Sequence, residues 1–229
     1  METKSLKGFF TAKNIAYVAV LLALVIVLQT FGGTISIGVV QLNFTLIPIV
    51  IGAILFGPAV GALLGLACGV VVLIQVIMGL VPFYTVIWTN SPVITFFTCV
   101  VKTTAAGLAA GFAYRWLERK NKLAAVFVAA GIVPIINTGL FILGCLCMSN
   151  AISVFQGNIE MTGMNVFVFI VIVLVTWNFF LEFAINLIVA PALYRVVLVV
   201  EKYIGKRYGK KVVESEEQEE PASETESEE

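Results

Sequence analysis

Six long apolar runs fill the chain before residue 201 and largely decide what it can fold into. Each comes close to or exceeds the ~20 residues that a helix needs to cross a ~30 Å bilayer core. Because lipid offers backbone groups no hydrogen-bond partners, the runs predict helices. With 60% hydrophobic residues and a mean hydropathy of +1.03, the composition excludes a water-soluble protein. The runs cover residues 12–31, 39–56, 58–79, 91–117, 123–148 and 165–200.

Basic residues predict how an all-α bundle of six transmembrane helices is oriented. Thirteen of the fourteen Lys and Arg residues lie at or before the start of the first run, from the end of the fourth run to the start of the fifth, or from the end of the sixth onward. Six helices place all of them on one side, which the positive-inside rule assigns to the cytoplasm. The loops 32–38, 80–90 and 149–164 then face outward.

This topology divides the chain into three parts. Residues 1–11 form a cytoplasmic N-terminus, and residues 12–200 form the transmembrane domain. Residues 201–229 form a cytoplasmic tail that is first basic and then acidic. Nine of the fourteen Glu residues fall in the last sixteen positions, a composition that cannot bury apolar surface and predicts disorder.

The residue types that are missing exclude most catalytic chemistry. The chain has no His and no Asp, which removes Ser-His-Asp triads, aspartyl dyads and most metal sites. It also has no GxxxxGK[ST] loop for the phosphates of ATP. Its four Cys residues lie inside apolar runs, where a thiol behaves as a small hydrophobe. We therefore expect no enzyme, no cofactor and no metal site.

Two of the predicted helices carry faces of small residues. Four alanines on the first helix fall within about 60° of one another. This flat apolar face suits contact with a separate membrane partner as well as packing within the bundle, and we favour the partner. They are Ala12, Ala16, Ala19 and Ala23. The third run has Gly at every fourth position, which lets another helix approach closely, and packing within the chain is the simpler explanation. These residues are Gly57, Gly61, Gly65 and Gly69.

Lys102 and Glu182 are charged residues within the apolar runs. Each lies thirteen residues before an Arg at the inner boundary, Arg115 and Arg195, or about 20 Å along a helix. The two should therefore lie at similar depth. A charge there costs at least ~2.5 kcal/mol on insertion scales, so each must face the bundle interior, a partner or a ligand. Two interpretations remain open, an ion pair between helices and a ligand pocket.

Polar residues near these charges favour the pocket. Thr95, Thr98 and Lys102 share a face of the fourth helix, and Asn178 and Glu182 stack at spacing four on the sixth. Polar groups that converge from several helices, mixed with aromatics, suit one small polar molecule. Tyr84 and Trp88 could equally well be aromatic anchors at the membrane interface or ligand contacts. The remaining candidates are Gln41, Asn43, Gln75, Tyr84, Trp88, Asn90, Asn137, Thr138 and Asn186.

The sequence resembles the substrate-binding S component of energy-coupling factor (ECF) vitamin transporters over roughly residues 8–205. The resemblance rests on the six spans, the pairs Ala12/Ala16 and Ala19/Ala23, and the segment LNFTLIPIVIGAILFGPAVGALLGLACG at 42–69. It implies a multi-pass subunit of the bacterial plasma membrane that captures a water-soluble vitamin from outside. It also implies a transmembrane T component that docks on the small face of the first helix, and two cytosolic ATPases.

The substrate is predicted from one segment and one charge. SPVITFFTCVVKTTAAGLAAG, at 91–111, is similar to the riboflavin and pantothenate branch, and a buried Lys102 suits a carboxylate. We favour pantothenate, with riboflavin as the alternative if Glu182 neutralises Lys102. A self-sufficient permease that uses the Lys102 and Glu182 pair for coupling is the competing hypothesis. An intramembrane enzyme or a scaffold is a third, weakened by the missing catalytic residues.

Overall fold

The computed structural model describes the backbone of residues 12–32, 36–37, 40–41 and 43–219, and the side chains of 14–31 and 43–200. The chain divides into two compact units, Met1–Pro191 and Ala192–Glu229. Every site residue discussed below belongs to the first unit.

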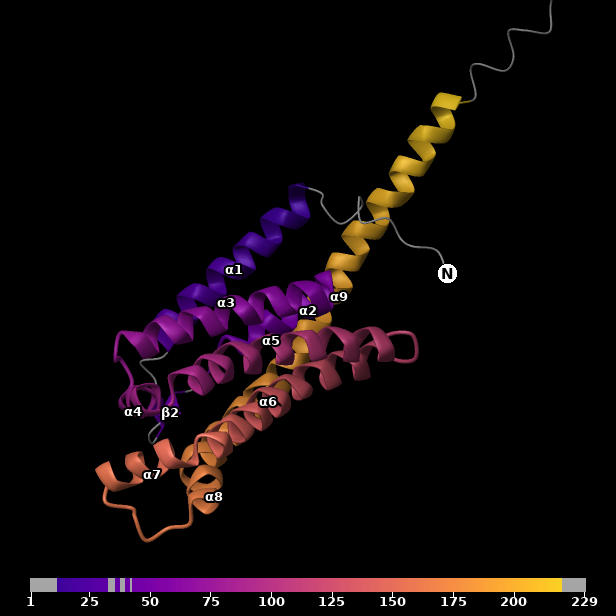
Figure 1. The fold of residues 1–229 in the computed structure, drawn as a ribbon. Coiled ribbons are helices and arrows are strands. Elements are labelled where there is room, and N and C mark those ends of the chain that lie inside the picture. Colours follow the sequence, from indigo (N-terminus) through magenta and orange to yellow (C-terminus); the bar gives the residue numbers. More distant parts are fainter. Residues whose placement is uncertain (1–11, 33–35, 38–39, 42, 220–229) are drawn as a thin grey trace, which may run out of the picture. The chain divides into compact units, whose positions relative to one another are not determined.

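The described part of the chain is helical apart from one short hairpin, which confirms the predicted all-α class (Figure 1). In the hairpin, Ser36 pairs with Gln41 and Ile37 with Val40, in antiparallel register. A proline near the first position begins α3, α4 and α5, where its missing N–H costs nothing. The elements are α1 Ala12–Gly32, β1 Ser36–Ile37, β2 Val40–Gln41, α2 Leu46–Phe56, α3 Pro58–Ile77, α4 Pro82–Asn90, α5 Pro92–Leu117, α6 Lys122–Cys147, α7 Ser149–Asn158, α8 Val166–Phe169, the π-helical segment η2 Ile170–Val175, and α9 Thr176–Glu219.

Five stretches of the described residues are long and apolar enough to cross a membrane, and α2 is a shorter apolar helix. The predicted second span, 39–56, therefore needs correction, since helix begins only at Leu46. Its eleven residues rise about 16 Å, too little to cross a bilayer alone. Non-helical backbone is tolerated at membrane depth where it is buried in protein or lines a cavity. Thr45, directly before α2, is 1% exposed.

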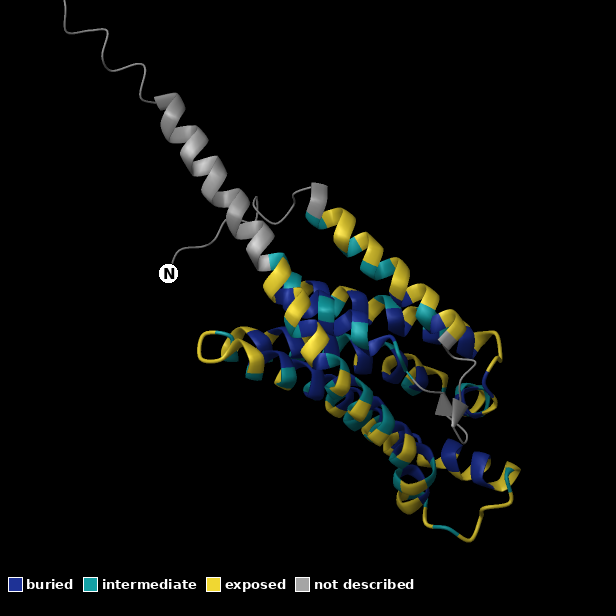
Figure 2. Ribbon diagram, turned by 180° about the vertical axis from the view of Figure 1, so that it is seen from behind, coloured by how far each residue is buried: buried dark blue, intermediate teal, exposed yellow. Residues whose placement is uncertain are grey.

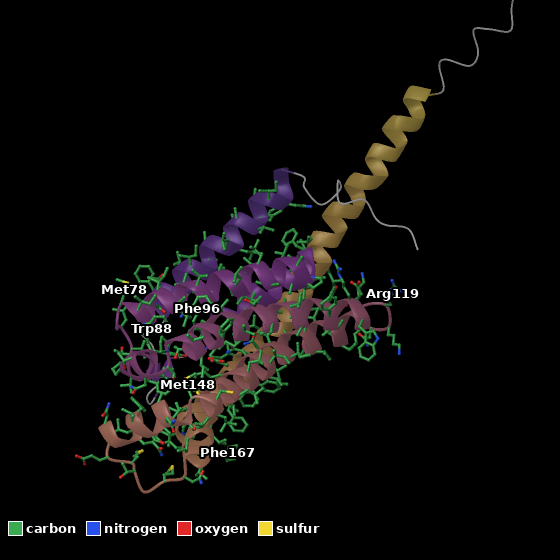
Figure 3. The ribbon with its side chains drawn as sticks, in the orientation of Figure 1. Met78, Trp88, Phe96, Arg119, Met148 and Phe167 are labelled. Carbon is green, nitrogen blue, oxygen red and sulfur yellow. The ribbon has the colours of Figure 1, made fainter. Side chains whose placement is uncertain are left out.

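Two predicted loops and part of the tail are helices instead. The loops 80–90 and 149–164 contain α4 and α7, which lie at the end of the bundle opposite the turn that carries Arg119 (Figures 1 and 3). The expected disordered tail from residue 201 is helical as far as Glu219, because α9 continues through it. Lys and Glu are good helix formers, and opposite charges four residues apart add support. Residues 220–229 lie outside the described residues.

The glycine ridge of α3 packs on α5, which confirms packing within the chain. A Cβ at Gly61 would overlap the carbonyl of Gly107, and one at Gly65 would overlap the carbonyl of Thr103. A Cβ at Gly69 would lie 2.7 Å from the carbonyl oxygen of Cys99. The two backbones are therefore in direct contact over two helical turns. Much of this α3 and α5 layer is buried in Figure 2.

Helix α1 lies largely exposed beside α2 and α3 (Figure 2). Its buried contacts come from Val25 and Gln29, at 0% and 7% exposure. Ala16, Ala19 and Ala23 are exposed and lie about 120–180° around the helix from Val25. The side chain of Ala12 is outside the described residues. The alanine face of α1 thus points away from the bundle.

Aromatic rings hold α4 against its neighbours and so position Tyr84. Phe83 packs edge-on against Phe155 of α7 and Phe141 of α6, with centroid distances of 5.1 and 6.1 Å. Edge-to-face contacts of this kind add about 0.5–1.5 kcal/mol beyond the area they bury. The short helix α4 is therefore anchored over the end of α5 and α6 despite its nine residues.

Candidate functional site

Lys102, in the middle of α5, has only weak partners around its ammonium group among the described residues. The residue is 6% exposed, and Nζ donates a long hydrogen bond of 3.4 Å to the Tyr84 hydroxyl. Nζ also lies 4.9 Å from the centroid of the Phe141 ring and 5.8 Å from that of Tyr84, within cation–π range. Since an ammonium has three N–H donors, Lys102 can still bind a strong acceptor.

Tyr84 contributes a neutral hydroxyl to this environment. Burial raises the pKa of its phenol, although the nearby Lys102 opposes that shift. At neutral pH the group therefore stays protonated. It can accept from Lys102 and donate its own hydrogen to a ligand.

Glu182, on α9, is the second buried charge, and it is 7% exposed. Its Oε1 accepts a 2.9 Å hydrogen bond from the backbone N–H of Asn43, in the segment that precedes α2. Asn186, one turn later, donates from Nδ2 to the backbone carbonyl of Glu182 at 2.8 Å. The carboxylate is thus held by a backbone donor that comes from 139 positions away in the chain.

Lys102 and Glu182 do not pair with each other. Within the part of the chain whose side chains are described, no Lys or Arg nitrogen lies within 4.0 Å of the Glu182 carboxylate. Both residues instead line one cavity. Of the two interpretations that the sequence left open, the geometry matches the pocket.

The cavity lies among α1, α3, α4, α5, α6 and the segment from η2 into α9. It contains about 570 Å³ free of atoms, counting the part open to its surroundings. Its lining consists of Gln29, Asn43, Val72, Tyr84, Lys102, Asn137, Thr138, Phe141, Leu174, Val175, Asn178, Phe179 and Glu182.

Two asparagines in the cavity have unused hydrogen-bonding groups. The Oδ1 atoms of Asn137 and Asn178 are buried and have no hydrogen-bond partner. The residues are 5% and 9% exposed and come from α6 and α9. Buried polar groups are normally paired, and an unpaired one costs roughly 1–3 kcal/mol. Within the described part of the chain, these two amide oxygens therefore lack the partner that a buried acceptor normally has.

A π-helical segment precedes the α9 residues of the site. At the end of η2, Thr176, the first residue of α9, donates from its backbone N–H and from its hydroxyl to the carbonyl of Val171, five residues back, the hydroxyl at 2.7 Å. A π turn holds more residues than an α turn and so rotates the next part of the helix around its axis. Leu174 and Val175 within this segment line the cavity together with Asn178. The hydrophobic pattern of 165–200 gave no sign of this change in helix type.

A hydrogen-bond network ties α1 to the cavity through Gln29. The Gln29 amide donates to Oε1 of Gln75 at 3.1 Å, and Gln75 donates back to the Gln29 carbonyl at 3.0 Å. Thr45 donates to Oε1 of Gln29 at 3.4 Å and contacts Asn43. Asn43 in turn binds Glu182. The network therefore connects α1 and α3 with the buried carboxylate on α9.

The structure brings together some of the predicted site residues and separates others. Lys102, Tyr84, Asn137, Asn178 and Glu182 line the cavity, as do Asn43 and Thr138. Gln75 reaches it only through Gln29. The side chain of Gln41 lies outside the described residues.

Four predicted site residues do not line the cavity. Thr95 donates to the carbonyls of Ile87 and Ser91, whereas Thr98 donates to Ile94 and packs against Gly144. Asn90 is exposed and donates to Val86. Trp88 is half-buried on α4, at the end of the bundle that also carries Met148 (Figure 3).

The sequence interpretation missed Gln29 and the apolar lining residues. A glutamine inside the apolar run 12–31 was a usable signal, because a polar side chain in a span normally seeks a protein partner. Phe141 and Phe179 gave no such signal. Among seventeen Phe residues in this chain, many of them facing outward, the sequence does not mark the ones that line a cavity.

The fold and the cavity define a class: a multi-pass helical membrane protein with an internal cavity lined largely by polar residues. Its sequence matches the family described as ECF transporter, substrate-specific component, over residues 13–194. The match covers most of the chain, and the protein belongs to that family. A comparison with curated proteins gives no match. As a family member it is a transport subunit that works with a T component and ATPases in a membrane module.

Proposed function

We propose that this chain captures pantothenate and presents it to an ECF module for import. The observation that carries the proposal is Lys102, a buried ammonium that lines a polar cavity and whose partners, within the described side chains, are a long hydrogen bond and two ring faces. A carboxylate provides the acceptor that this group lacks. Pantothenate carries one carboxylate, one amide and hydroxyl groups, which suit the asparagines beside Lys102.

Riboflavin is the alternative substrate, favoured if Glu182 neutralises Lys102. The absence of that ion pair from the described residues supports the anionic ligand instead. The deciding measurement is mass spectrometry of the small molecule that co-purifies with the chain. The protein is then freed of bound ligand and titrated with each vitamin. We expect pantothenate to be recovered and to bind more tightly than riboflavin. Recovery of riboflavin would replace our assignment.

We propose that the chain receives its energy from the ATPases of the module, with both of its termini in the cytoplasm. Vesicles that contain this chain alone should bind substrate without accumulating it, whereas addition of the T component and two ATPases should give ATP-dependent uptake. A self-sufficient permease predicts uptake by the chain alone. That result would favour coupling through Lys102 and Glu182.

The alanine face of α1 is the proposed docking surface for the T component. Replacing Ala19 and Ala23 with Leu should leave substrate affinity within about twofold, because both residues point away from the cavity and the bundle. Assembly should fail, since bulk prevents close helix approach. The measurement compares vitamin binding with recovery of the complex by affinity purification.

A control for this variant comes from the same helix. Leu24→Phe adds bulk to an exposed side chain that lies about 100° around α1 from Ala23. Assembly should survive this change. If Leu24→Phe blocks assembly as strongly as the double substitution, or if the double variant loses vitamin binding, the docking surface is not the alanine face.

A further inference from the structure

Glu182 is the second charged residue that lines the cavity. A ligand carboxylate that binds Lys102 does not also provide a partner for Glu182. Its Oε1 accepts from the Asn43 backbone, and none of the described residues donates to its other oxygen. A buried carboxylate needs hydrogen-bond donors or an opposite charge to offset the loss of water. Lys102 does not supply that charge within 4.0 Å. A bound molecule that carries hydrogen-bond donors can supply these partners.

Two further groups of the cavity have the same requirement. Asn137 and Asn178 line the cavity together with Glu182, and the buried Oδ1 of each has no hydrogen-bond partner among the described residues. Asn178 lies four residues before Glu182 on the same helix, so one ligand group can reach both. The cavity thus combines one strong donor, Lys102, with a separate set of acceptors on α6 and α9.

We infer that Glu182, Asn137 and Asn178 bind hydrogen-bond donors of the ligand, so that the site selects a hydroxylated carboxylate over a carboxylate without hydroxyl groups. This inference rests on the proposed function and adds a second determinant of specificity to Lys102. A ligand that lacks the hydroxyls leaves buried acceptors unpaired. Sites that bind a substrate hydroxyl reject the analogue without it far more strongly than apolar pockets reject a missing methylene.

The test compares two probes on the full chain in detergent. One is pantothenate, and the other is its analogue in which both hydroxyl groups are replaced by hydrogen, with the carboxylate and amide retained. Calorimetric titration should show the analogue binding at least about 100-fold more weakly to the unmodified chain. Because this comparison needs no substitution, it does not depend on how well a variant folds.

Two variants then assign the discrimination to residues. Glu182→Gln preserves the shape of the side chain but removes its charge, and Asn178→Ala removes an amide without touching Glu182. Each should reduce the difference between the two probes to about tenfold or less. Thr104→Val, on α5 with a hydroxyl bonded to its own helix at Val100, should leave the difference unchanged.

The possible results separate this inference from the proposed function. If pantothenate binds and the analogue binds equally well, the inference is overturned while the proposed function stands. If the discrimination is present but survives in both variants, the assignment to these residues is wrong. If neither probe binds the unmodified chain, the proposed function and the inference fail together.

Discussion

Replacing Lys102 with Met should weaken pantothenate binding roughly 10- to 100-fold. Methionine keeps the unbranched stem of the side chain but removes the ammonium, so the loss reports the charge-assisted hydrogen bonds to the ligand carboxylate. Such bonds contribute about 1.5–3 kcal/mol, and about 1.4 kcal/mol corresponds to tenfold in affinity. Titration calorimetry on the purified variant measures the change.

The same variant distinguishes a binding role from a structural one. Without ligand, the Lys102 ammonium is buried with weak partners, so its removal should leave the melting temperature unchanged or raise it. A structural ion pair would show the opposite, because removing one partner of a buried pair costs about 3–5 kcal/mol. Thr104→Val serves as the control on the same helix. Unaltered affinity in a folded Lys102→Met protein would contradict the assignment.

Gly65→Ala should strongly destabilise the bundle. Even a single methyl group at this position overlaps the backbone carbonyl of Thr103, and a backbone cannot move aside as a flexible side chain can. The α3 and α5 helices would have to separate. Overpacking costs up to about 3 kcal/mol in cores that can adjust, which corresponds to roughly 6–12 °C in melting temperature for a chain of this size.

Gly139→Ala is the matched control for Gly65→Ala. Gly139 lies within α6, and a Cβ built there meets nothing within 4 Å. The substitution should change the melting temperature by no more than a few degrees, since Ala is also the better helix former. Thermal unfolding of both variants in the same detergent gives the comparison. Equal small shifts would show that α3 and α5 tolerate separation.

Sequence patterns predicted the long helices well because a bilayer imposes a simple rule. An apolar run of about 20 residues has few other options in lipid, so α3, α5 and α6 begin and end within a few residues of the expected limits. The second run failed for a physical reason. Hydropathy reports which residues avoid water, and a buried non-helical residue such as Thr45, directly before α2, satisfies that condition as well as a helical one does.

The candidate site was predictable in its charges but not in its boundary. Lys102 and Glu182 stood out because charge at membrane depth is costly, and spacing on one helix correctly joined Asn178 to Glu182. Helical periodicity also placed Thr95 and Thr98 beside Lys102. It could not show that their hydroxyls bond to carbonyls of α4 and α5, which is a common way for Thr to satisfy itself in a helix.

The amino-acid sequence alone predicted the membrane-embedded helices, the small-residue faces and two charges at similar depth. It could do so because the cost of placing polar groups in lipid acts on each residue separately. Only the tertiary structure decided that Lys102 meets Tyr84 and Phe141 while Glu182 meets the backbone of Asn43. Which groups become neighbours depends on how helices rotate and how closely they approach. Here the glycine contacts of α3 with α5 and the π turn of η2 set that geometry.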